Sequence, residues 1–473
     1  MTEQSLLRMN EQEMRDAATK AVELIIQHFL KLQEEPVIRK GSRKELDALF
    51  DRDFPVQSKD IDTLLHDIRN KIFTNILHLD HPRCFAFVPG PSNFIAVIGD
   101  MLASAFNVFN GVWLESSGAT EIELTVIDWL RQALGYPETA GGLFVSGGSA
   151  ANLTALCAAR EKMLGEDFTD GTAYFSDQTH SSVTKALRIL GIRKSNIRVV
   201  PSNDSFAIDM EKLKDFIHLD REKDRKPFLV IGNAGTTNTG AMDPLEEIAD
   251  VCRENKLWFH VDGAIGASTA LCSSRKGALR GIDLADSITM DPHKWLFQPY
   301  EMGCLLVRDR LKLLETFHMR PEYLQDAKSS LDEPNLADFG MQLTRNFKAL
   351  KLWLTFKFFG SETIDAAIER GFQLSEYTAH LIRVHEELQL MSGPSLGIVC
   401  FQYRQASSSP DDVDDLQQRI VNRLVEDGFA MVTTTVIRGR TVLRACTINP
   451  RTAESDIQQT LDRICRIGRD LVQ

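Results

Sequence analysis

Between residues 141 and 307, short apolar runs alternate along the chain with stretches of helical period. Short hydrophobic strands separated by helices are typical of βαβ units, which build a mostly parallel sheet covered by helices on both faces. The runs that predict strands are residues 142–145, 172–175, 197–200, 228–233, 257–261, 287–290 and 304–307. Ligands of such sheets bind beyond the carboxyl ends of the strands. The pattern therefore predicts an α/β domain with a mostly parallel seven-stranded sheet and a site at one edge of it.

The N-terminal part of the chain has a different pattern. Residues 11–33 carry apolar side chains at close to helical spacing, which predicts an amphipathic helix. Such a helix needs a second surface to cover its apolar stripe. That surface is either a dimer partner or another part of the same chain.

The pattern changes again after the large sheet. Residues 346–390 predict long helices, and three later runs predict strands at residues 398–403, 431–435 and 441–447. A last helix is expected from about residue 452. The predicted division is a helical segment at 1–88, a large domain at 89–360 and a small α+β C-terminal domain at 361–473.

Composition narrows the class of protein. At 473 residues the chain exceeds the size of one hydrophobic core, and 43% hydrophobic and 25% charged residues are ordinary for a globular protein. A formal net charge of −12 argues against nucleic acid or an anionic membrane as the main partner. No apolar run reaches the ~18 residues that a membrane span needs. The eight cysteines lack the spacing of a disulfide framework or metal site, so we expect reduced thiols, a cytoplasmic protein and no bound metal.

The most informative residue is Lys294, within the sequence Asp-Pro-His-Lys-Trp of residues 291–295. Apolar, strand-like runs precede and follow this segment. An amine among apolar neighbours loses solvation of its charged form and becomes a nucleophile towards carbonyls. Lys294 is therefore a candidate to form a Schiff base with pyridoxal phosphate (PLP). The alternative is a buried lysine paired with an acid such as Asp286 or Asp291.

Residues 145–152 close a predicted strand and open an alanine-rich helix. Gly147 and Gly148 let backbone amides approach an anion, Ser149 adds a hydroxyl donor, and the helix N-terminus contributes a positive dipole. The segment predicts a phosphate site, with an ordinary strand-to-helix turn as the alternative. It has neither the GxGxxG of a dinucleotide site nor the GK[ST] of a P-loop.

Other predicted strands also end in polar residues. Asp262 follows a buried strand, where an acid needs a partner such as a protonated pyridine nitrogen, and the small Ala264 leaves room for a flat ring. His180 is a candidate for stacking on such a ring or for proton transfer. Thr236 and Thr237 offer hydroxyls at the same edge. The alternatives are an acid that caps the next segment and a structural histidine.

With these motifs the chain strongly resembles the group II PLP-dependent decarboxylases, the family of the aromatic-L-amino-acid, histidine and glutamate decarboxylases. The resemblance covers almost the whole chain and is carried by residues 81–83, 149–153, 177–182, 260–262, 292–295, 443–444 and 449–452. It implies a large domain of PLP fold type I (aspartate aminotransferase-like). It also implies a homodimer with a shared active site, in which the N-terminal segment is swapped between subunits.

The resemblance implies roles for individual residues. Lys294 would hold the cofactor, Asp262 would pair with its pyridine nitrogen, and His180 would stack on the ring. The other cofactor-binding residues that it implies are Ala264 beneath the ring, Gly148, Ser149 and His293 at the phosphate, Thr237 near the ring and Asp291 beside the phosphate.

Tyr323 matches the tyrosine that opens the family's mobile catalytic loop. In the decarboxylases that tyrosine helps to protonate the carbanion after CO2 leaves, whereas phenylalanine there is associated with aldehyde-forming relatives. With Lys294, His180 and Tyr323 as catalytic residues, the resemblance implies α-decarboxylation of an L-amino acid.

The residues expected to bind the substrate are mostly apolar or aromatic: Phe87, Val88, Pro89, Phe109 and Trp113, together with Arg345, which matches a family arginine near the dimeric site. We therefore expect a small-molecule substrate, an L-aromatic amino acid, namely tyrosine, tryptophan, phenylalanine or DOPA. The alternatives are a decarboxylase of aspartate, glutamate, cysteine sulfinate or diaminobutyrate, an aldehyde synthase, and a PLP-holding regulatory protein. An acidic substrate remains an alternative because Arg83 is a nearby cation that could bind a second carboxylate. The chain departs from the family at two positions, which leaves the substrate open. It has Asp291 where many aromatic-type relatives have asparagine, and Gly90 where the animal aromatic decarboxylases have threonine.

Overall fold

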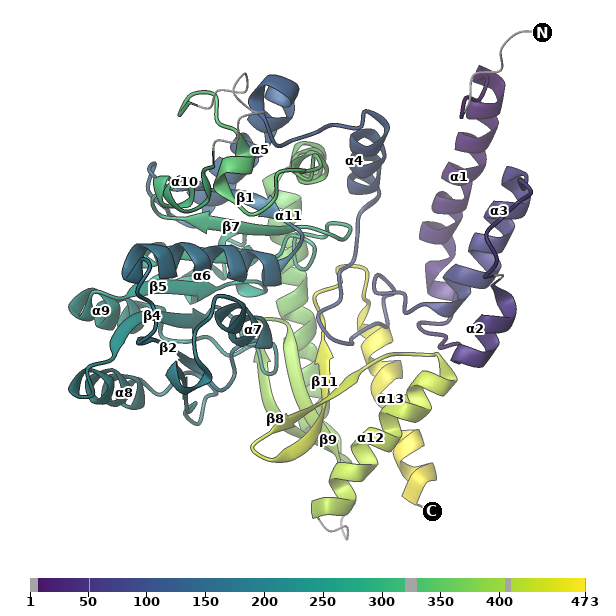
Figure 1. Cartoon of the computed structure of the whole chain (residues 1–473). Helices are drawn as coiled ribbons and strands as arrows, with labels where there is room; N and C mark the ends of the chain where they lie inside the picture. Colours follow the sequence, from purple (N-terminus) through teal and green to yellow (C-terminus); the bar gives the residue numbers. More distant parts are fainter. Residues whose placement is uncertain (1–6, 51, 320–329, 405–409, 473) are drawn as a thin grey trace.

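The predicted runs form one seven-stranded sheet with the strand order β1-β7-β6-β5-β4-β2-β3 (Figure 1). The computed structural model of the chain describes residues 7–50, 52–319, 330–404 and 410–472. The strands are β1 (Gly141–Val145), β2 (Gly171–Ser176), β3 (Ile197–Val200), β4 (Lys226–Asn233), β5 (Trp258–Asp262), β6 (Ser287–Met290) and β7 (Gly303–Val307). Strands β3, β2, β4, β5 and β6 are parallel, whereas β7 is antiparallel to both β6 and β1. The prediction of a mostly parallel seven-stranded sheet is confirmed.

Helices cover both faces of this sheet, which explains why the strands read as unbroken apolar runs (Figure 1). Side chains alternate between the faces, so Leu143 packs with the helices of one face and Phe144 with those of the other. The first face is covered by α6 (Gly148–Leu164), α7 (Ser181–Ile189) and α10 (Leu311–Phe317). The second is covered by α5 (Trp113–Ala133), α8 (Met210–Glu222), α9 (Leu245–Asn255) and α11 (Ala349–Val384), with α4 (Phe94–Ala105) packed on α11. In the described ranges, no helix combines the length and the apolar character that a membrane crossing requires.

A second sheet of four antiparallel strands forms the C-terminal domain, in the order β10-β11-β9-β8. Its elements are β8 (Leu388–Ser395), β9 (Ile398–Tyr403), α12 (Pro410–Asp427), β10 (Thr433–Ile437), β11 (Arg440–Cys446) and α13 (Glu454–Val472). The prediction of helix up to residue 390 was wrong at its end, because α11 stops at Val384 and β8 follows. β8 is mostly half-buried and contains Gly393 and Pro394, so it lacks the alternation of apolar side chains that indicates a strand. The helix is also interrupted at Gly360, the predicted domain limit, where φ is 74°.

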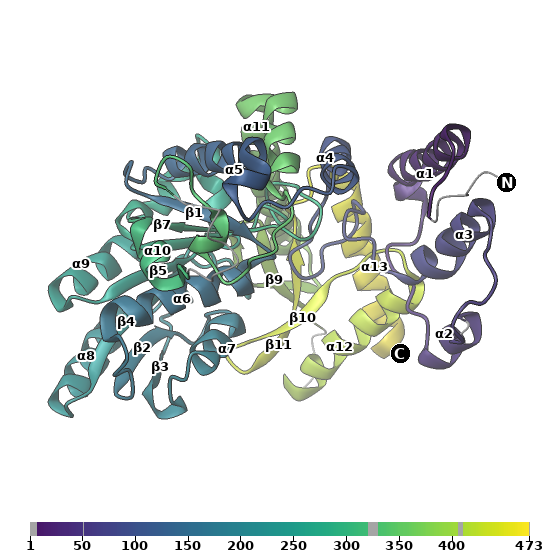
Figure 2. The same ribbon diagram turned by 45° about the horizontal axis from the view of Figure 1, so that its top comes forward.

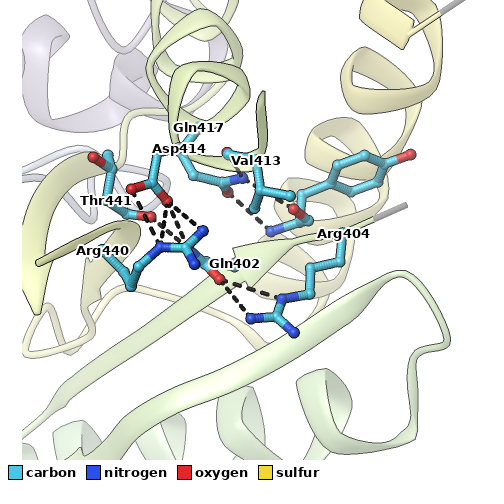
Figure 3. A network of polar contacts seen from close by, with 8 residues as sticks. Gln402, Arg404, Val413, Asp414, Gln417, Arg440 and Thr441 are labelled. Atoms are coloured by element: carbon cyan, nitrogen blue, oxygen red, sulfur yellow. Dashed lines mark hydrogen bonds and ion pairs between the residues drawn. The ribbon is translucent and has the colours of Figure 1, made fainter. Parts of the chain in front are cut away.

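A polar network joins α12 to the second sheet (Figure 3). Asp414 on α12 accepts hydrogen bonds from Arg440 Nε at 3.1 Å and Nη2 at 3.0 Å, and from Gln402 Nε2 at 3.3 Å. Gln417, one helical turn later, accepts from the backbone N–H of Tyr403 and donates to its carbonyl, each at 2.9 Å. These paired donors and acceptors fix the position of α12 along β9 and β11.

The N-terminal helices lie beside the C-terminal domain, apart from the seven-stranded sheet (Figures 1 and 2). They are α1 (Glu11–Lys31), α2 (Arg43–Leu49) and α3 (Ile61–Asp67). α1 begins with a capping box in which the side chains of Asn10 and Glu13 accept from each other's backbone N–H groups. The predicted amphipathic helix is thus confirmed as α1. None of its 21 residues is buried, so the rest of the chain covers its apolar stripe only in part.

Candidate active site

Five strands of the large sheet end around one cavity of about 360 Å³. This volume is in the range of small-molecule sites, roughly 300–1,000 Å³. Its lining residues are Ser146, Gly147, Gly148, Ser149, Ala150, Asn152, His180, Ser182, Asn233, Gly235, Thr236, Thr237, Asp262, Ala264, Ile265, Asp291, His293, Lys294 and Glu301. All nine residues assigned to cofactor binding from the sequence are among them. The strand ends thus meet at the predicted edge of the sheet and bring these side chains together.

The turn between β1 and α6 offers donors for an anion. The first backbone amides of a helix have no acceptor within the helix, and the helix dipole adds positive potential there. A Cβ at Gly148 would lie 2.8 Å from Asp291 Oδ2, and one at Gly147 would lie 3.3 Å from His293 Cε1. The two glycines therefore let the segment before Lys294 approach the start of α6.

Asp262 is a buried carboxylate at the end of β5. Asn152 Nδ2 donates to its Oδ2 at 3.0 Å, while the Ala264 N–H at 3.2 Å and the Thr289 hydroxyl at 3.4 Å donate to its Oδ1. These donors are all uncharged, and Asp262 forms no ion pair within the described residues. A buried carboxylate without a counter-ion is unfavourable, and a protonated pyridine nitrogen would supply the missing charge.

Asn152 connects Asp262 to two histidines. Its Nδ2 also donates to the Ser182 hydroxyl, and His260 Nε2 lies 3.0 Å from its Oδ1. Because that carbonyl oxygen only accepts, His260 carries its proton on Nε2, and its Nδ1 accepts from the Ser287 hydroxyl at 2.7 Å. Burial lowers the pKa of His260 to about 4, which keeps the imidazole neutral. The sequence contained Asn152 within a motif but assigned it no role, because spacing along the chain does not reveal a hydrogen-bond hub.

His180 is oriented by the same network. It precedes α7, and the backbone N–H of Ser182 donates to its Nδ1 at 3.2 Å, with the Ser182 hydroxyl 2.8 Å from the same nitrogen. Since Nδ1 accepts these bonds, a neutral His180 carries its proton on Nε2. Ser182 itself accepts from Asn152, so a continuous chain of hydrogen bonds joins His180 to Asp262.

Lys294 lines the cavity and forms an ion pair there, with its Nζ 2.9 Å from Asp291 Oδ2. His293 Nε2 lies 3.7 Å from the same oxygen, and burial lowers the pKa of His293. The other oxygen of Asp291 is buried and has no hydrogen-bond partner among the described residues. The pairing with Asp291 that the sequence left as the alternative is therefore present. This ion pair does not exclude Schiff-base formation by Lys294, because Lys294 also lines the cavity.

The two candidate threonines differ in their contacts. The Thr236 hydroxyl lies 3.0 Å from that of Thr239 and accepts from the Ala241 N–H at 3.2 Å. The Thr237 hydroxyl has no hydrogen bond within the described part of the chain, and only its carbonyl is used, by Arg444 Nε at 2.9 Å. Thr237 is thus the threonine whose hydroxyl is available to a ligand.

A second buried acid, Asp243, bonds to a residue that lines the cavity. Asp243 accepts three hydrogen bonds of 2.7 Å each, from the Ile208 N–H and from the backbone and side chain of Asn233. Asn233 lines the cavity and also donates to Thr179 Oγ1 at 3.0 Å, next to His180. Burial raises the pKa of Asp243 to about 6. The sequence did not predict the pair of Asp243 and Asn233, because neither residue belongs to a recognisable motif.

The residues predicted to bind the substrate do not line this cavity. Phe87 is 58% exposed and lies with Thr237 at a neighbouring hollow of about 390 Å³. Val88 packs against the core of the large domain and Pro89 is buried. Phe109 precedes α5 and Trp113 begins it, both half-buried. Neither Phe109 nor Trp113 lines the cavity of its own chain.

Arg345 makes its contacts within its own protomer. It is buried, forms an ion pair with Glu123 and donates from Nη2 to the Phe144 carbonyl at 2.9 Å and from Nη1 to the Asn110 carbonyl at 3.3 Å. These contacts connect α5 to β1 within the protomer, and Arg345 does not line the cavity. Its guanidinium is held by internal acceptors, and its role at a dimeric site stays a prediction. Tyr323 lies outside the described residues.

The residues of the cavity fit PLP. The start of α6 offers amides to a phosphate, Asp262 lacks the counter-ion that a pyridine nitrogen provides, and Lys294 presents a primary amine in the same cavity. The partnerless oxygen of Asp291 indicates that the polar groups are not fully satisfied within the protein itself.

Comparison with known proteins agrees with this chemistry. The pyridoxal-dependent decarboxylase conserved domain matches residues 44–404. The chain belongs to the pyridoxal-dependent decarboxylase family. The sequence resemblance to the group II enzymes is thereby confirmed, and PLP is the cofactor of this decarboxylase.

Individual relatives span almost the whole length of this decarboxylase. It is 42% identical over 467 residues to an aromatic-L-amino-acid decarboxylase of Bacillus atrophaeus, covering 98% of this chain and 97% of the relative. It is 28% identical over 467 residues to a phenylacetaldehyde synthase of Arabidopsis thaliana, covering 95% of each. A crystal structure of Oryza sativa TDC with PLP and tryptamine has a TM-score of 0.94 at 28% identity, covering 99% of this chain and 100% of that one.

We expect Asn152→Ala to weaken PLP binding about tenfold, because a buried hydrogen bond lost at Asp262 costs about 1–3 kcal/mol and 1.4 kcal/mol is a factor of ten. The dissociation constant is measured from the quenching of protein fluorescence on addition of PLP. Thr154→Ala is the matched control, since Thr154 is buried on the same helix but bonds only to the Ala150 carbonyl. Equal affinities for the two variants would show that the Asn152 hub does not support the cofactor site.

The neutral, buried His260 predicts a pH dependence of stability. Its pKa is about 4 in the folded protein against 6.5 as the ordinary value, so between these values the unfolded chain binds a proton that the folded protein does not. The free energy of unfolding therefore falls as pH decreases from 6.5 towards 4. Urea unfolding of His260→Gln should show a smaller fall over this range than the wild-type enzyme. Parallel pH profiles would contradict the assignment.

Proposed function

We propose that this decarboxylase converts an L-aromatic amino acid to the corresponding amine and CO2. The observation that carries the proposal is the convergence of Lys294, Asp262 and His180 on one cavity. The aromatic class is supported by the 42% identical aromatic-L-amino-acid decarboxylase and by the tryptamine in the related crystal structure. Seven cavity residues would bind or orient the cofactor as the sequence resemblance implies: Gly148, Ser149, His293 and Asp291 near the phosphate, and Ala264, Thr237 and His180 around the ring.

Bound PLP supplies the electron sink that stabilises the charge left on Cα when CO2 departs. The protein supplies position and charge. Lys294 would hold the cofactor through Nζ, and until then Asp291 holds the ammonium group by the 2.9 Å ion pair. Asp262 would keep the pyridine nitrogen protonated, and Asn152 keeps that carboxylate aimed by its 3.0 Å hydrogen bond.

Two residues would move the proton at Cα. His180 uses Nδ1 to accept from Ser182, so Nε2 is the nitrogen left to face the substrate. We propose Tyr323, on the strength of the family resemblance, as the donor to Cα once CO2 has left. The pre-set tautomer of His180 means that little reorganisation is needed during the reaction.

We also propose that a second copy of the chain completes the active site. Exposed apolar side chains occur in the same segments as Phe109 and Trp113 and in residues 341–343: Leu102, Phe106, Leu114, Met341 and Leu343 are 40–79% exposed. Monomeric proteins rarely expose contiguous apolar patches larger than a few hundred Å². α1 has no buried residue and needs a cover as well. A homodimer would bury both surfaces and would bring Phe109 and Trp113 towards the partner's cavity.

An aldehyde synthase is the second candidate function, favoured by the 28% identical phenylacetaldehyde synthase. Tyr323 speaks for the decarboxylase, because the aldehyde-forming relatives are associated with phenylalanine at that position. The location that we propose is the cytoplasm, which all eight cysteines support by being free thiols.

The proposed reaction is tested by a CO2-release screen of the twenty amino acids and DOPA with added PLP. We expect release from aromatic amino acids, with amine as the product. Lys294→Ala should lose CO2 release by on the order of 1,000-fold or more, while the matched Lys185→Ala, an exposed lysine outside the cavity, keeps it. Release only from acidic amino acids would overturn the substrate class, and aldehyde with peroxide in place of amine would identify a synthase.

The shared site is tested by mixing two inactive chains. A Lys294→Ala chain and a chain carrying Phe109→Ala with Trp113→Ala should each have low activity. After subunit exchange, half of the dimers are hybrid and hold one site with native residues from both chains, so roughly a quarter of wild-type activity should return. Activity that stays at the sum of the two separate chains would mean that each site is built from one chain.

A further inference from the structure

Two histidines and an aspartate that do not line the PLP cavity lie close together. His28, in the last turn of α1, meets His78 and Asp80 from the segment between α3 and α4. The donor atoms of the three half-buried side chains all lie within 4.8 Å of one another. We propose that His28, His78 and Asp80 form a zinc site that fastens α1 to the body of the protein.

The distances suit a metal ion after a small adjustment. Tetrahedral zinc holds imidazole nitrogens and carboxylate oxygens at roughly 2.0–2.2 Å, which places neighbouring donor atoms about 3.3 Å apart. His28 Nε2 and Asp80 Oδ2 are 3.2 Å apart. A donor nitrogen of His78 lies within 4.8 Å of both atoms, so His78 has to move closer to share the same ion.

His78 supplies a second observation. Its Nδ1 is buried and lacks a hydrogen-bond partner within the described residues. Its backbone N–H donates to the Val37 carbonyl at 2.9 Å, which keeps the residue in place. A buried imidazole nitrogen without a partner is unfavourable, and coordination of a metal satisfies it.

The donor set identifies the class of metal. Two imidazoles and one carboxylate, with a fourth position open to water, form a zinc set, whereas calcium and magnesium prefer oxygen donors. The nearby cation Arg451 does not occupy the carboxylate, because its Nη1 donates to the Asp80 backbone carbonyl at 3.4 Å and its guanidinium lies over the Phe29 ring. The Asp80 carboxylate thus has its 3.2 Å contact with His28 Nε2, itself a proposed ligand, and no bond to Arg451.

A second group of possible ligands is already engaged. In the cluster of His385, Glu387 and Cys465, the Glu387 carboxylate accepts from the Tyr403 hydroxyl at 3.0 Å and from Arg469 at 2.6 Å. His385 Nδ1 accepts from the Glu387 N–H at 3.2 Å. A metal there would have to break these bonds, so this cluster serves as a control.

The site would have a structural consequence for α1. Asn449 Nδ2 donates to the Asp80 carbonyl at 3.0 Å, which anchors the ligand segment to the residues before α13. α1, in contrast, has no buried residue. A metal shared by His28 and Asp80 would therefore connect a weakly packed helix to a segment that Asn449 bonds to the C-terminal domain.

The test uses the full-length, PLP-loaded enzyme after removal of metals with a chelator. Zn²⁺ is titrated in competition with a chromophoric chelator, and Co²⁺ is added separately to record the visible absorption of a tetrahedral site. We expect one saturable site per chain. His28→Gln and Asp80→Asn should each weaken Zn²⁺ binding at least about tenfold, since even partners of metal ligands contribute 10–100-fold, and should lose the Co²⁺ band.

Two controls make the result specific. His66→Gln, a histidine 72% exposed on α3, and His385→Gln in the second cluster should leave the affinity unchanged. Zn²⁺ should also slow tryptic cleavage within α1, at Arg15, Lys20 or Lys31, in the wild-type enzyme but not in His28→Gln. The absence of a saturable site, wild-type Zn²⁺ affinity in both His28→Gln and Asp80→Asn, or a loss of affinity confined to His385→Gln would each overturn the proposal. Because His28 is partly exposed, its variant remains informative even where a change at His78 prevents folding.

Discussion

Burial of both faces of the seven-stranded sheet is the constraint on which the site depends. Where helices cover each face, polar side chains inside the sheet need internal partners, and the strand ends become the place for chemistry. The contact between β1 and β7 illustrates the packing, because a Cβ at Gly142 would lie 1.8 Å from the Leu305 carbonyl oxygen. The turns that follow β1, β2, β4, β5 and β6 then meet around a single cavity.

Within that cavity the protein stabilises charge without cancelling it. Asp262 receives hydrogen bonds from neutral donors, so its negative charge stays available to a cofactor. The same Asn152 that bonds Asp262 also bonds Ser182, which sets the tautomer of His180. Because a few buried polar groups orient both residues, the geometry is in place before a ligand arrives.

The N-terminal helices follow a different principle from the sheet domain. α1 has a well-formed capping box and no buried residue, so the rest of the described chain covers its apolar stripe only in part. The proposed dimer and the proposed zinc site act on this same helix. The first would cover its apolar stripe, and the second would hold its C-terminal end at Asp80. The position of α1 would then depend on the proposed zinc site and on the proposed dimer, and the same dimer would complete the active site.

The sequence by itself was sufficient to predict the strands of the large sheet, because a strand buried on both faces must be a short apolar run between turns. It was enough for the positions of Lys294, Asp262 and His180 too, since residues directly after parallel strands share one edge. The sequence did not predict β8, because this half-buried strand has no regular alternation of apolar and polar side chains.

Only the tertiary structure decided which distant polar groups share a buried volume. Asn152 and Asp262 are 110 residues apart, Arg345 and Glu123 are 222 apart, and His28 and Asp80 are 52 apart. Arg345 thus became an internal partner of Glu123, and two histidines and an acid without any motif became a candidate metal site. Spacing along a chain reports local neighbours, whereas the partner of a buried charge is chosen by the packing of the whole fold.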